Sequence, residues 1–97
     1  MNSTIDAMRD FVHTRIREAA KANWQPVPEP TDDFNLVESG LFDSLGFVAL
    51  LSAMENQFHF TMDPAELESE DLSILRNLLQ AAMRSAAGST EASQHAR

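Results

Sequence analysis

The stretch that decides the fold of this 97-residue chain is DSLGFVALLSAMENQF, residues 43–58. Its large apolar residues recur every three or four positions, which is the period of one face of an α-helix. They are Phe47, Leu50, Leu51, Met54 and Phe58. Asp43 or Ser44 can cap this segment, because both side chains accept hydrogen bonds from the free amides of a helix start. The stretch therefore predicts an amphipathic helix over residues 44–58.

Similar apolar stripes lie on both sides of this helix. Residues 4–22 and a segment that begins at Asp71 or Ser73 and ends near Arg84 each follow the 3–4 spacing. Between them, Asp63-Pro64-Ala65-Glu66 combines a cap, a proline at the first helical position and a Glu at the third, which predicts a short helix. The fold class that follows is all-α: a four-helix bundle with three longer helices and one short one.

The segments between the helices carry their own patterns. Residues 24–42 contain prolines at 26, 28 and 30, which exclude a helix, but their apolar residues predict a long first loop pinned to the core. Apolar and polar residues alternate in FHFTM at 58–62, as in a strand. The sequence contains no second alternating run that could pair with it, so the pattern predicts an extended connector. Residues 85–97 hold no large apolar side chain and predict a disordered tail after a domain of residues 1–84.

Composition and charge exclude several classes of protein. Fifteen acidic and seven basic residues give a net charge of −8, which disfavours nucleic-acid binding and anionic membranes. Cysteine is absent, so disulfides, thiol nucleophiles and cysteine-ligated zinc are excluded. No apolar run approaches the roughly 20 residues of a membrane span, and we expect a cytoplasmic protein. Residues 22–75 hold eleven acids and no Lys or Arg, which indicates either a solvated face or a docking surface for basic partners.

Catalytic and metal-binding patterns fail on spacing. His13, His59 and His95 lie in three different segments without a metal-ligand spacing. An EF-hand loop starting at Asp33 would meet Val37 and Glu38 where an acid or amide and a glycine are required. We therefore expect neither a catalytic residue nor a metal site.

Ser44 is the candidate for covalent modification, because of its position at the start of the predicted helix. A helix start needs one cap, so with Asp43 and Ser44 adjacent, one of them is free for another task. A phosphate attached there would meet the positive end of the helix and its unpaired amides. The alternative is that Ser44 serves as an ordinary N-cap.

The sequence SGLFDSLGFVALL at 39–51 closely resembles the acyl/peptidyl carrier protein family, in which the serine of a D-S-L motif carries 4′-phosphopantetheine. The resemblance extends over residues 5–84 and includes MENQFHFTMDPAEL at 54–67. It implies a bundle of the acyl-carrier type, with residues 1–84 as a carrier domain. It also implies a monomeric, non-catalytic acyl or aminoacyl carrier that holds a thioester cargo on an arm attached to Ser44.

The outward positions of the 44–58 helix imply which partners the carrier meets. These positions form a nearly neutral strip, unlike the acidic helix usual in fatty-acid carriers: Leu45, Val48, Ala49, Ser52 and Glu55. Gly46 stands where acids are frequent in that group. This pattern looks like peptidyl carriers and stand-alone carriers such as the D-alanyl carrier group. The resemblance implies a phosphopantetheinyl transferase, an adenylating acyl or aminoacyl ligase, and downstream acyl-transfer or synthase enzymes as partners.

The resemblance also assigns roles to residues near Ser44. Asp43 and Leu45 are expected to help the transferase recognise the site, and Val48, Ser52 and Glu55 to contact partner enzymes. The alternative function is a cofactor-free acidic helical module that docks basic partners through residues 22–75.

Overall fold

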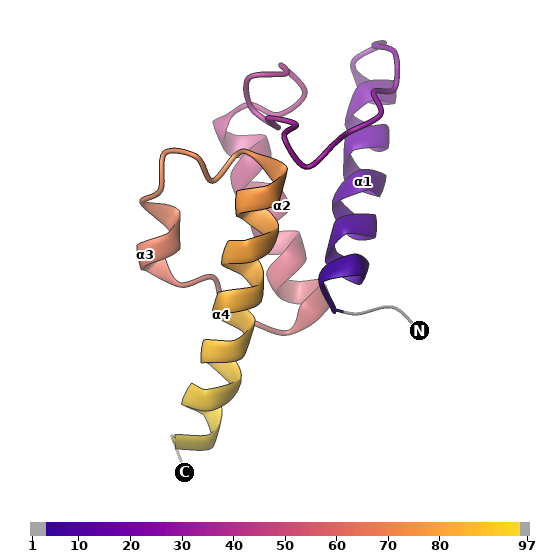
Figure 1. The fold of residues 1–97 in the computed structure, drawn as a ribbon. Helices are drawn as coiled ribbons and strands as arrows, with labels where there is room; N and C mark the ends of the chain where they lie inside the picture. The colour runs from indigo at the N-terminus through magenta and orange to yellow at the C-terminus, as the bar shows by residue number, and fades with distance from the viewer. Residues whose placement is uncertain (1–3, 96–97) are drawn as a thin grey trace.

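The computed structural model describes residues 4–95, and the side chains of residues 4–87. Its elements are α1 (Thr4–Ala22), α2 (Ser44–Phe58), α3 (Pro64–Leu67) and α4 (Leu75–His95) (Figure 1). The all-α fold with three long helices and one short one is confirmed. Over the described residues, no helix combines the length and the apolar character that crossing a membrane requires.

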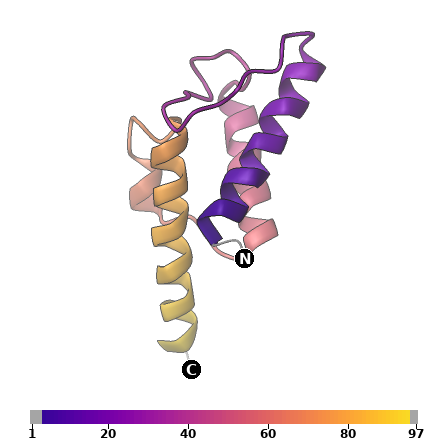
Figure 2. The ribbon, with the colours of Figure 1, turned by 45° about the vertical axis from the view of Figure 1, so that its right-hand side comes forward.

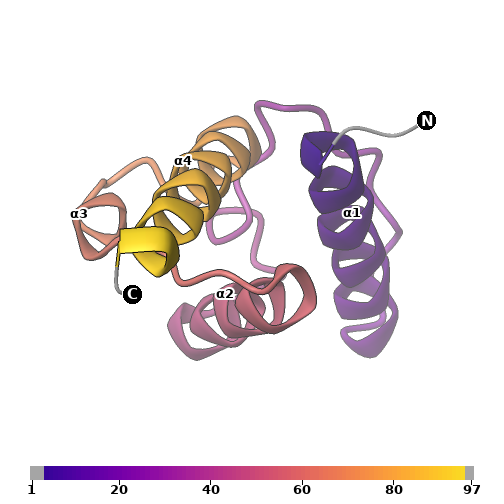
Figure 3. The same cartoon turned by 90° about the horizontal axis from the view of Figure 1, so that it is seen from below.

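The three long helices surround one apolar core (Figure 3). Helix α1 packs against both α2 and α4. The buried residues lie on the helix faces that the periodicity predicted; the largest wholly buried ones on the three helices are Met8, Val12, Ile16, Met54, Leu75, Leu78 and Leu79. Two residues of the predicted α2 stripe, Phe47 and Phe58, are only half-buried. Phe58 lies at the α1–α2 seam, where its ring meets Phe11 edge to face at a centroid distance of 5.8 Å.

The long loop between α1 and α2 is held by backbone hydrogen bonds to the start of α4. The amide of Leu36 donates to the carbonyl of Ser73 at 2.8 Å, and the amide of Leu75 donates to the carbonyl of Phe34 at 2.9 Å. The amide of Arg76 donates to the carbonyl of Asp32 at 2.8 Å. The first amides of a helix have no partner within the helix, so the loop carbonyls cap α4. The expectation that this loop is pinned to the core is confirmed at Leu36 and Leu41, which are buried. It is wrong for three other apolar residues of the loop, which are exposed: Trp24, Val27 and Val37.

This pairing explains why α4 begins at Leu75 and not at Asp71 or Ser73, as the sequence predicted. Residues 69–74 form tight turns, in which Leu72 donates to the carbonyl of Ser69 and Ile74 to that of Asp71. Ile74 also forms an isolated antiparallel bridge with Asn35. The helix therefore starts only after the chain has paired with the loop.

The connector after α2 turns its apolar residues inward, as its alternation predicted. Helix α2 ends at His59, whose φ of 57° is left-handed, and Phe60 and Met62 are buried. Met62 donates its amide to Oε2 of Glu55 at 2.7 Å. The carboxylate of Asp63 then caps α3 by accepting the amide of Ala65 at 2.9 Å.

The C-terminal end differs from the expectation. Helix α4 continues past Arg84 to His95, and its last turns extend beyond the other helices (Figure 2). Ser85, expected to open a disordered tail, is 4% exposed. Its Oγ accepts the amide of Asp63 at 2.9 Å and donates to Sδ of Met62 at 3.4 Å. Ser85 therefore packs against the connector between α2 and α3. Residues 96–97 of the expected tail, like residues 1–3 of the expected domain, lie outside the described residues.

The loop contributes a buried side chain to the core and also caps α4. Its contribution to the core can be tested with two neighbouring residues. Leu36 is wholly buried, whereas Val37 is 37% exposed. We expect Leu36→Ala to lower the free energy of unfolding by about 2–5 kcal/mol, because it empties a core position. Val37→Ala, the matched control, should cost less than about 1 kcal/mol. Urea unfolding followed by circular dichroism measures both, and equal losses would mean that Leu36 is not a core residue.

The role of Ser85 predicts a second difference. Ser85→Ala leaves the amide of Asp63 without its acceptor, and we expect a loss of about 1–3 kcal/mol in the free energy of unfolding. Ser52→Ala, at an exposed serine of α2, should change it by no more than about 0.5 kcal/mol. Thermal unfolding of both variants is the measurement; a neutral Ser85→Ala would mean that the bond from the amide of Asp63 does not stabilise the fold.

Candidate functional site

The N-terminus of α2 is capped by Asp43. The residue has extended backbone (φ −83°, ψ −176°), and its Oδ1 accepts the amide of Gly46 at 2.7 Å. A Cβ at position 46 would lie 3.1 Å from that same oxygen. Glycine therefore lets the carboxylate approach the helix closely, which is a physical reason for Gly46 at this position. Of the two capping candidates, the structure assigns the cap to Asp43.

Ser44 is consequently released from capping. It is the first residue of α2 and is exposed. Among the residues that the structure describes, none forms a hydrogen bond with its hydroxyl. The hydroxyl thus lies at the positive end of a 15-residue helix, where a negatively charged substituent is favoured. An exposed hydroxyl in this place fits covalent attachment of a phosphate-linked group, since the group can extend into solvent without displacing any contact.

The face of α2 that follows Ser44 is apolar and open. Leu45 is 81% exposed and Val48 is 57% exposed, and Ser52 is exposed one turn further on. The structure thus brings three of the predicted partner-contact residues onto one surface beside Ser44. Exposed side chains of this size keep apolar area in water that a partner could cover.

Glu55, the fourth predicted partner-contact residue, also has a structural role. It is half-buried, and its carboxylate holds the amide of Met62 in the connector. Its first visible role is therefore to fix the path between α2 and α3. The sequence could not reveal this bond, because nothing in the spacing of residues 55 and 62 implies it.

A pocket of about 310 Å³ lies between α2 and the segment that contains α3. It is lined by Phe47, Val48, Leu51, Ser52, Glu55, Met62, Leu67 and Leu72. Sequence reasoning identified the α2 side of this pocket but missed Leu67 and Leu72, which form the opposite wall. The available signal was the cap at Asp63, which places Leu67 at the end of a short helix next to α2.

The wall formed by α3 is anchored to α4 by an ion pair. The guanidinium of Arg84 donates to both oxygens of Glu66, at 2.7 and 2.8 Å. These hydrogen bonds from Arg84 hold the pKa of Glu66 below its ordinary value and raise that of Arg84. Because the pKa of Glu66 is lowered on folding, the pair stabilises the fold above the ordinary Glu pKa. It is lost as the pH falls through the lowered value.

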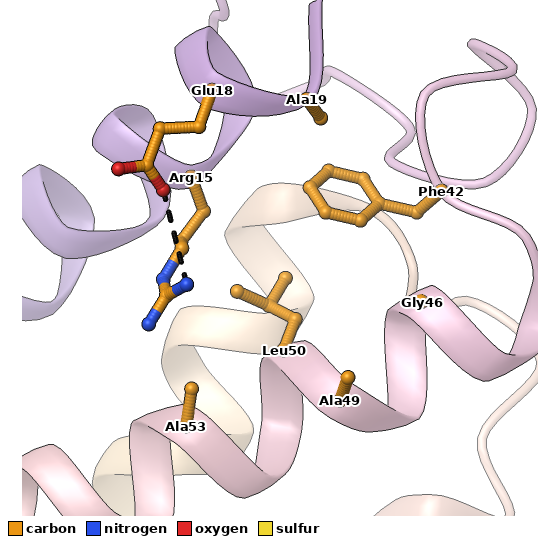
Figure 4. A pocket seen from close by; sticks show the side chains of 8 residues that line it. All are labelled: Arg15, Glu18, Ala19, Phe42, Gly46, Ala49, Leu50 and Ala53. Atoms are coloured by element: carbon orange, nitrogen blue, oxygen red, sulfur yellow. Dashed lines mark ion pairs between the residues drawn. The ribbon is translucent and has the colours of Figure 1, made fainter. Parts of the chain in front are cut away.

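A second pocket, also about 310 Å³, lies on the other side of α2 against α1 (Figure 4). Phe42, Leu50 and small residues of α2 line its apolar part. Arg15 and Glu18 of α1 form an ion pair of 3.8 Å at its edge. The guanidinium of Arg15 also lies 5.1 Å from the centroid of the Phe11 ring, which restrains it through a cation–π contact.

The acidic segment is partly neutralised by basic residues from outside it. Asp32 pairs with Arg9 at 3.4 Å, and Asp33 pairs with Arg76 at 2.6 Å. With Glu66 paired to Arg84, three of the eleven acids form ion pairs with arginines of α1 or α4. These carboxylates hold the fold together, which weakens the alternative of an acidic surface kept free for basic partners. Within the described part of the chain, no three His, Asp or Glu side chains group closely enough for a metal ion.

The comparisons with known proteins agree with this geometry. The family described as "Phosphopantetheine attachment site" matches residues 10–81. The D-alanyl carrier protein of Abiotrophia defectiva is 43% identical over 47 residues. That alignment covers 48% of this chain, and the chain spans 60% of the length of this relative. No solved structure gives a significant match. Because the family match extends over most of the chain and includes all of α2 and α3, the chain belongs to the phosphopantetheine attachment-site family of carrier proteins.

Proposed function

We propose that this chain carries an acyl or aminoacyl group as a thioester on a 4′-phosphopantetheine arm attached to Ser44 Oγ. The single observation that carries the assignment is that Asp43, and not Ser44, caps the start of α2. Asp43 caps the helix, and the neighbouring exposed hydroxyl of Ser44 has no bond to give up. The family match supports the nature of the attached group.

Attachment requires an enzyme that supplies the arm from coenzyme A. Ser44 Oγ would form the new bond to phosphorus and release its proton, while the nucleotide part of coenzyme A leaves. The positive end of α2 favours the negative phosphodiester that results. When attached, the arm supplies a thiol for thioester formation, and the chain itself contributes binding and presentation rather than catalysis.

The tethered cargo gains from proximity to successive enzymes. A flexible tether converts each encounter with a bound enzyme into an intramolecular event at a high effective concentration. Leu45, Val48 and Ser52 are the surface we assign to partner contact, because they are exposed beside Ser44. Asp43 contributes through its position next to Ser44, and Glu55 by fixing the connector that borders the same surface.

The similarity to a D-alanyl carrier protein supports an aminoacyl cargo loaded by an adenylating ligase. Such a ligase would convert the carboxylate to an acyl adenylate with ATP and release pyrophosphate. Transfer of the acyl group to the thiol of the arm would then form the thioester and release AMP. Coenzyme A and ATP are cytoplasmic supplies, which supports action in the cytoplasm. One copy of the chain contains every residue that this function uses, so we propose that it acts as a monomer.

The attachment site predicts a change in mass. Incubation with coenzyme A and a broad-specificity phosphopantetheinyl transferase should add the mass of one arm to the parent chain, and Ser44→Ala should add none. Ser69→Ala, at an exposed serine outside α2 and outside the surface assigned to partner contact, is the control and should be modified like the parent.

Because Asp43 remains as the cap, Ser44→Ala should stay folded and lose no more than about 1 kcal/mol. Intact-mass spectrometry and circular dichroism measure the two effects. An arm on Ser44→Ala would place the attachment at another residue.

The exposed apolar face predicts how partners dock. Val48→Asp places a charge in a contact that loses its water, and we expect loading by the cognate adenylating ligase to weaken by about 1–3 kcal/mol. The loss should persist at high salt, because apolar contact is not screened. Gln57→Asp adds the same charge to another exposed position of α2 and should leave loading nearly unchanged.

The measurement is the rate of loading against ligase concentration at two ionic strengths. Neutralising Asp32 and Asp33 would not test electrostatic docking cleanly, because these residues also form ion pairs with Arg9 and Arg76 within the chain. If Val48→Asp loads like the parent while Gln57→Asp does not, the docking face lies on the other side of α2.

A further inference from the structure

Trp24 is the most exposed large apolar residue that the structure describes, with 96% of its surface open to water. It is also the only tryptophan in the chain. Its neighbours in the chain from Lys21 to Val27 are exposed as well, so the indole has no packing surface within the described part of this protein. A side chain of this size normally contributes buried area to a core or to an interface.

The backbone at Trp24 is in the left-handed region, with φ of 58°. The amide of Gln25 donates to the carbonyl of Ala20 at 2.9 Å, and the amide of Trp24 to that of Lys21 at 3.2 Å. This pair of bonds is the Schellman arrangement that ends many helices, and the position Trp24 occupies in it is usually glycine. For a bulky residue the left-handed conformation is unfavourable.

Trp24 therefore strains the end of α1, and its indole gains no burial on folding that would compensate for the strain. Glycine would end the helix better. A residue that opposes local stability without any compensating contact in the chain points to a function outside it.

The location of Trp24 connects it with the attachment site. Figures 1 and 2 show the C-terminal end of α1 and the N-terminal end of α2 at the same end of the molecule. Trp24 follows α1 directly, and Ser44 begins α2. An enzyme that handles the group on Ser44 must approach this end of the bundle. Val27, 44% exposed in the same loop, adds apolar area beside it.

The charge around Trp24 restricts the kind of surface that fits. Lys21, exposed in the last turn of α1, is the basic residue nearest to Trp24 in the chain. The loop of residues 24–43 that follows contains five acidic residues and no Lys or Arg. The chain as a whole has a net charge of −8. A complementary surface would combine an apolar pocket for the indole with basic residues around its rim.

We infer that Trp24 is a docking anchor for the adenylating ligase that loads the arm on Ser44, its indole entering an apolar, basic-rimmed pocket of that enzyme. The inference rests on the proposed carrier function. A transferase must bring its substrate against Ser44 Oγ itself, so its contact is centred on the start of α2. A ligase acts at the far end of the attached arm, which leaves its contact with the protein free to extend to the end of α1.

The test separates stability from recognition. Trp24→Gly relieves the strained backbone, so its Tm should rise, by roughly 4–8 °C if the relief is near the usual cost of this conformation. Its loading by the ligase that loads the parent should fall roughly ten- to a hundredfold in kcat/KM, through KM. Trp24→Phe keeps an aromatic ring and should retain a larger share of the loading rate.

Each variant is first converted to the arm-bearing form with coenzyme A and a transferase, and its mass is measured. A failure of the parent at this step would overturn the carrier function, whereas equal modification of all variants leaves only ligase docking to be tested. Unchanged loading of Trp24→Gly would overturn the inference, and so would a transferase step slowed as much as loading. A lower Tm for Trp24→Gly would overturn the argument from strain.

A direct readout uses the fact that the chain has one tryptophan. Protein labelled with 5-fluorotryptophan should give a single ¹⁹F resonance, which reports on Trp24 even when the ligase contains tryptophans of its own. Addition of the ligase should shift or broaden this resonance, and Val48→Asp should reduce that effect by weakening the same complex. An unchanged resonance at ligase concentrations that saturate loading would exclude Trp24 from the interface.

Discussion

The backbone hydrogen bonds between the long loop and the start of α4 are the constraint on which the site depends. A loop of this length has many polar backbone groups, and those that are buried must find partners. Here Leu36 donates to Ser73, while Phe34 and Asp32 accept the first amides of α4. The loop and the helix thereby complete each other. Leu36 is buried as a consequence, and the chain then reaches Asp43 along a defined path.

At the start of α2, the cap formed by Asp43 leaves the hydroxyl of Ser44 exposed. Asp43 satisfies the amide of Gly46, and the absence of a side chain at position 46 lets its carboxylate come close. Ser44 is then exposed at the positive end of the helix with no internal bond. Of these two adjacent residues of the same capping type, Asp43 therefore has a structural role, and Ser44 is left available for the attachment that we propose.

The net charge does not show which acidic residues form ion pairs within the chain and which lie on a free surface. Asp32, Asp33 and Glu66 each pair with an arginine from α1 or α4. Each of these pairs joins segments that are distant in the sequence. The surface beside Ser44 is instead apolar, with Leu45 and Val48 exposed. This exposure is the basis of our proposal that partner enzymes bind this end of the molecule mainly through apolar contact.

The sequence by itself determined the helices, their buried faces, the cap at α3 and the position of Ser44. These depend on local signals: a 3–4 apolar period, capping side chains and a proline at a helix start. Tertiary structure alone decided where α4 begins, that Ser85 is buried, that Glu55 holds Met62, and that Leu67 and Leu72 complete a pocket with α2. Each of these features is a contact between residues that local spacing does not relate. Local periodicity specifies which face of a segment is apolar, but the partner of a hydrogen bond or the opposite wall of a pocket is chosen only when the segments pack.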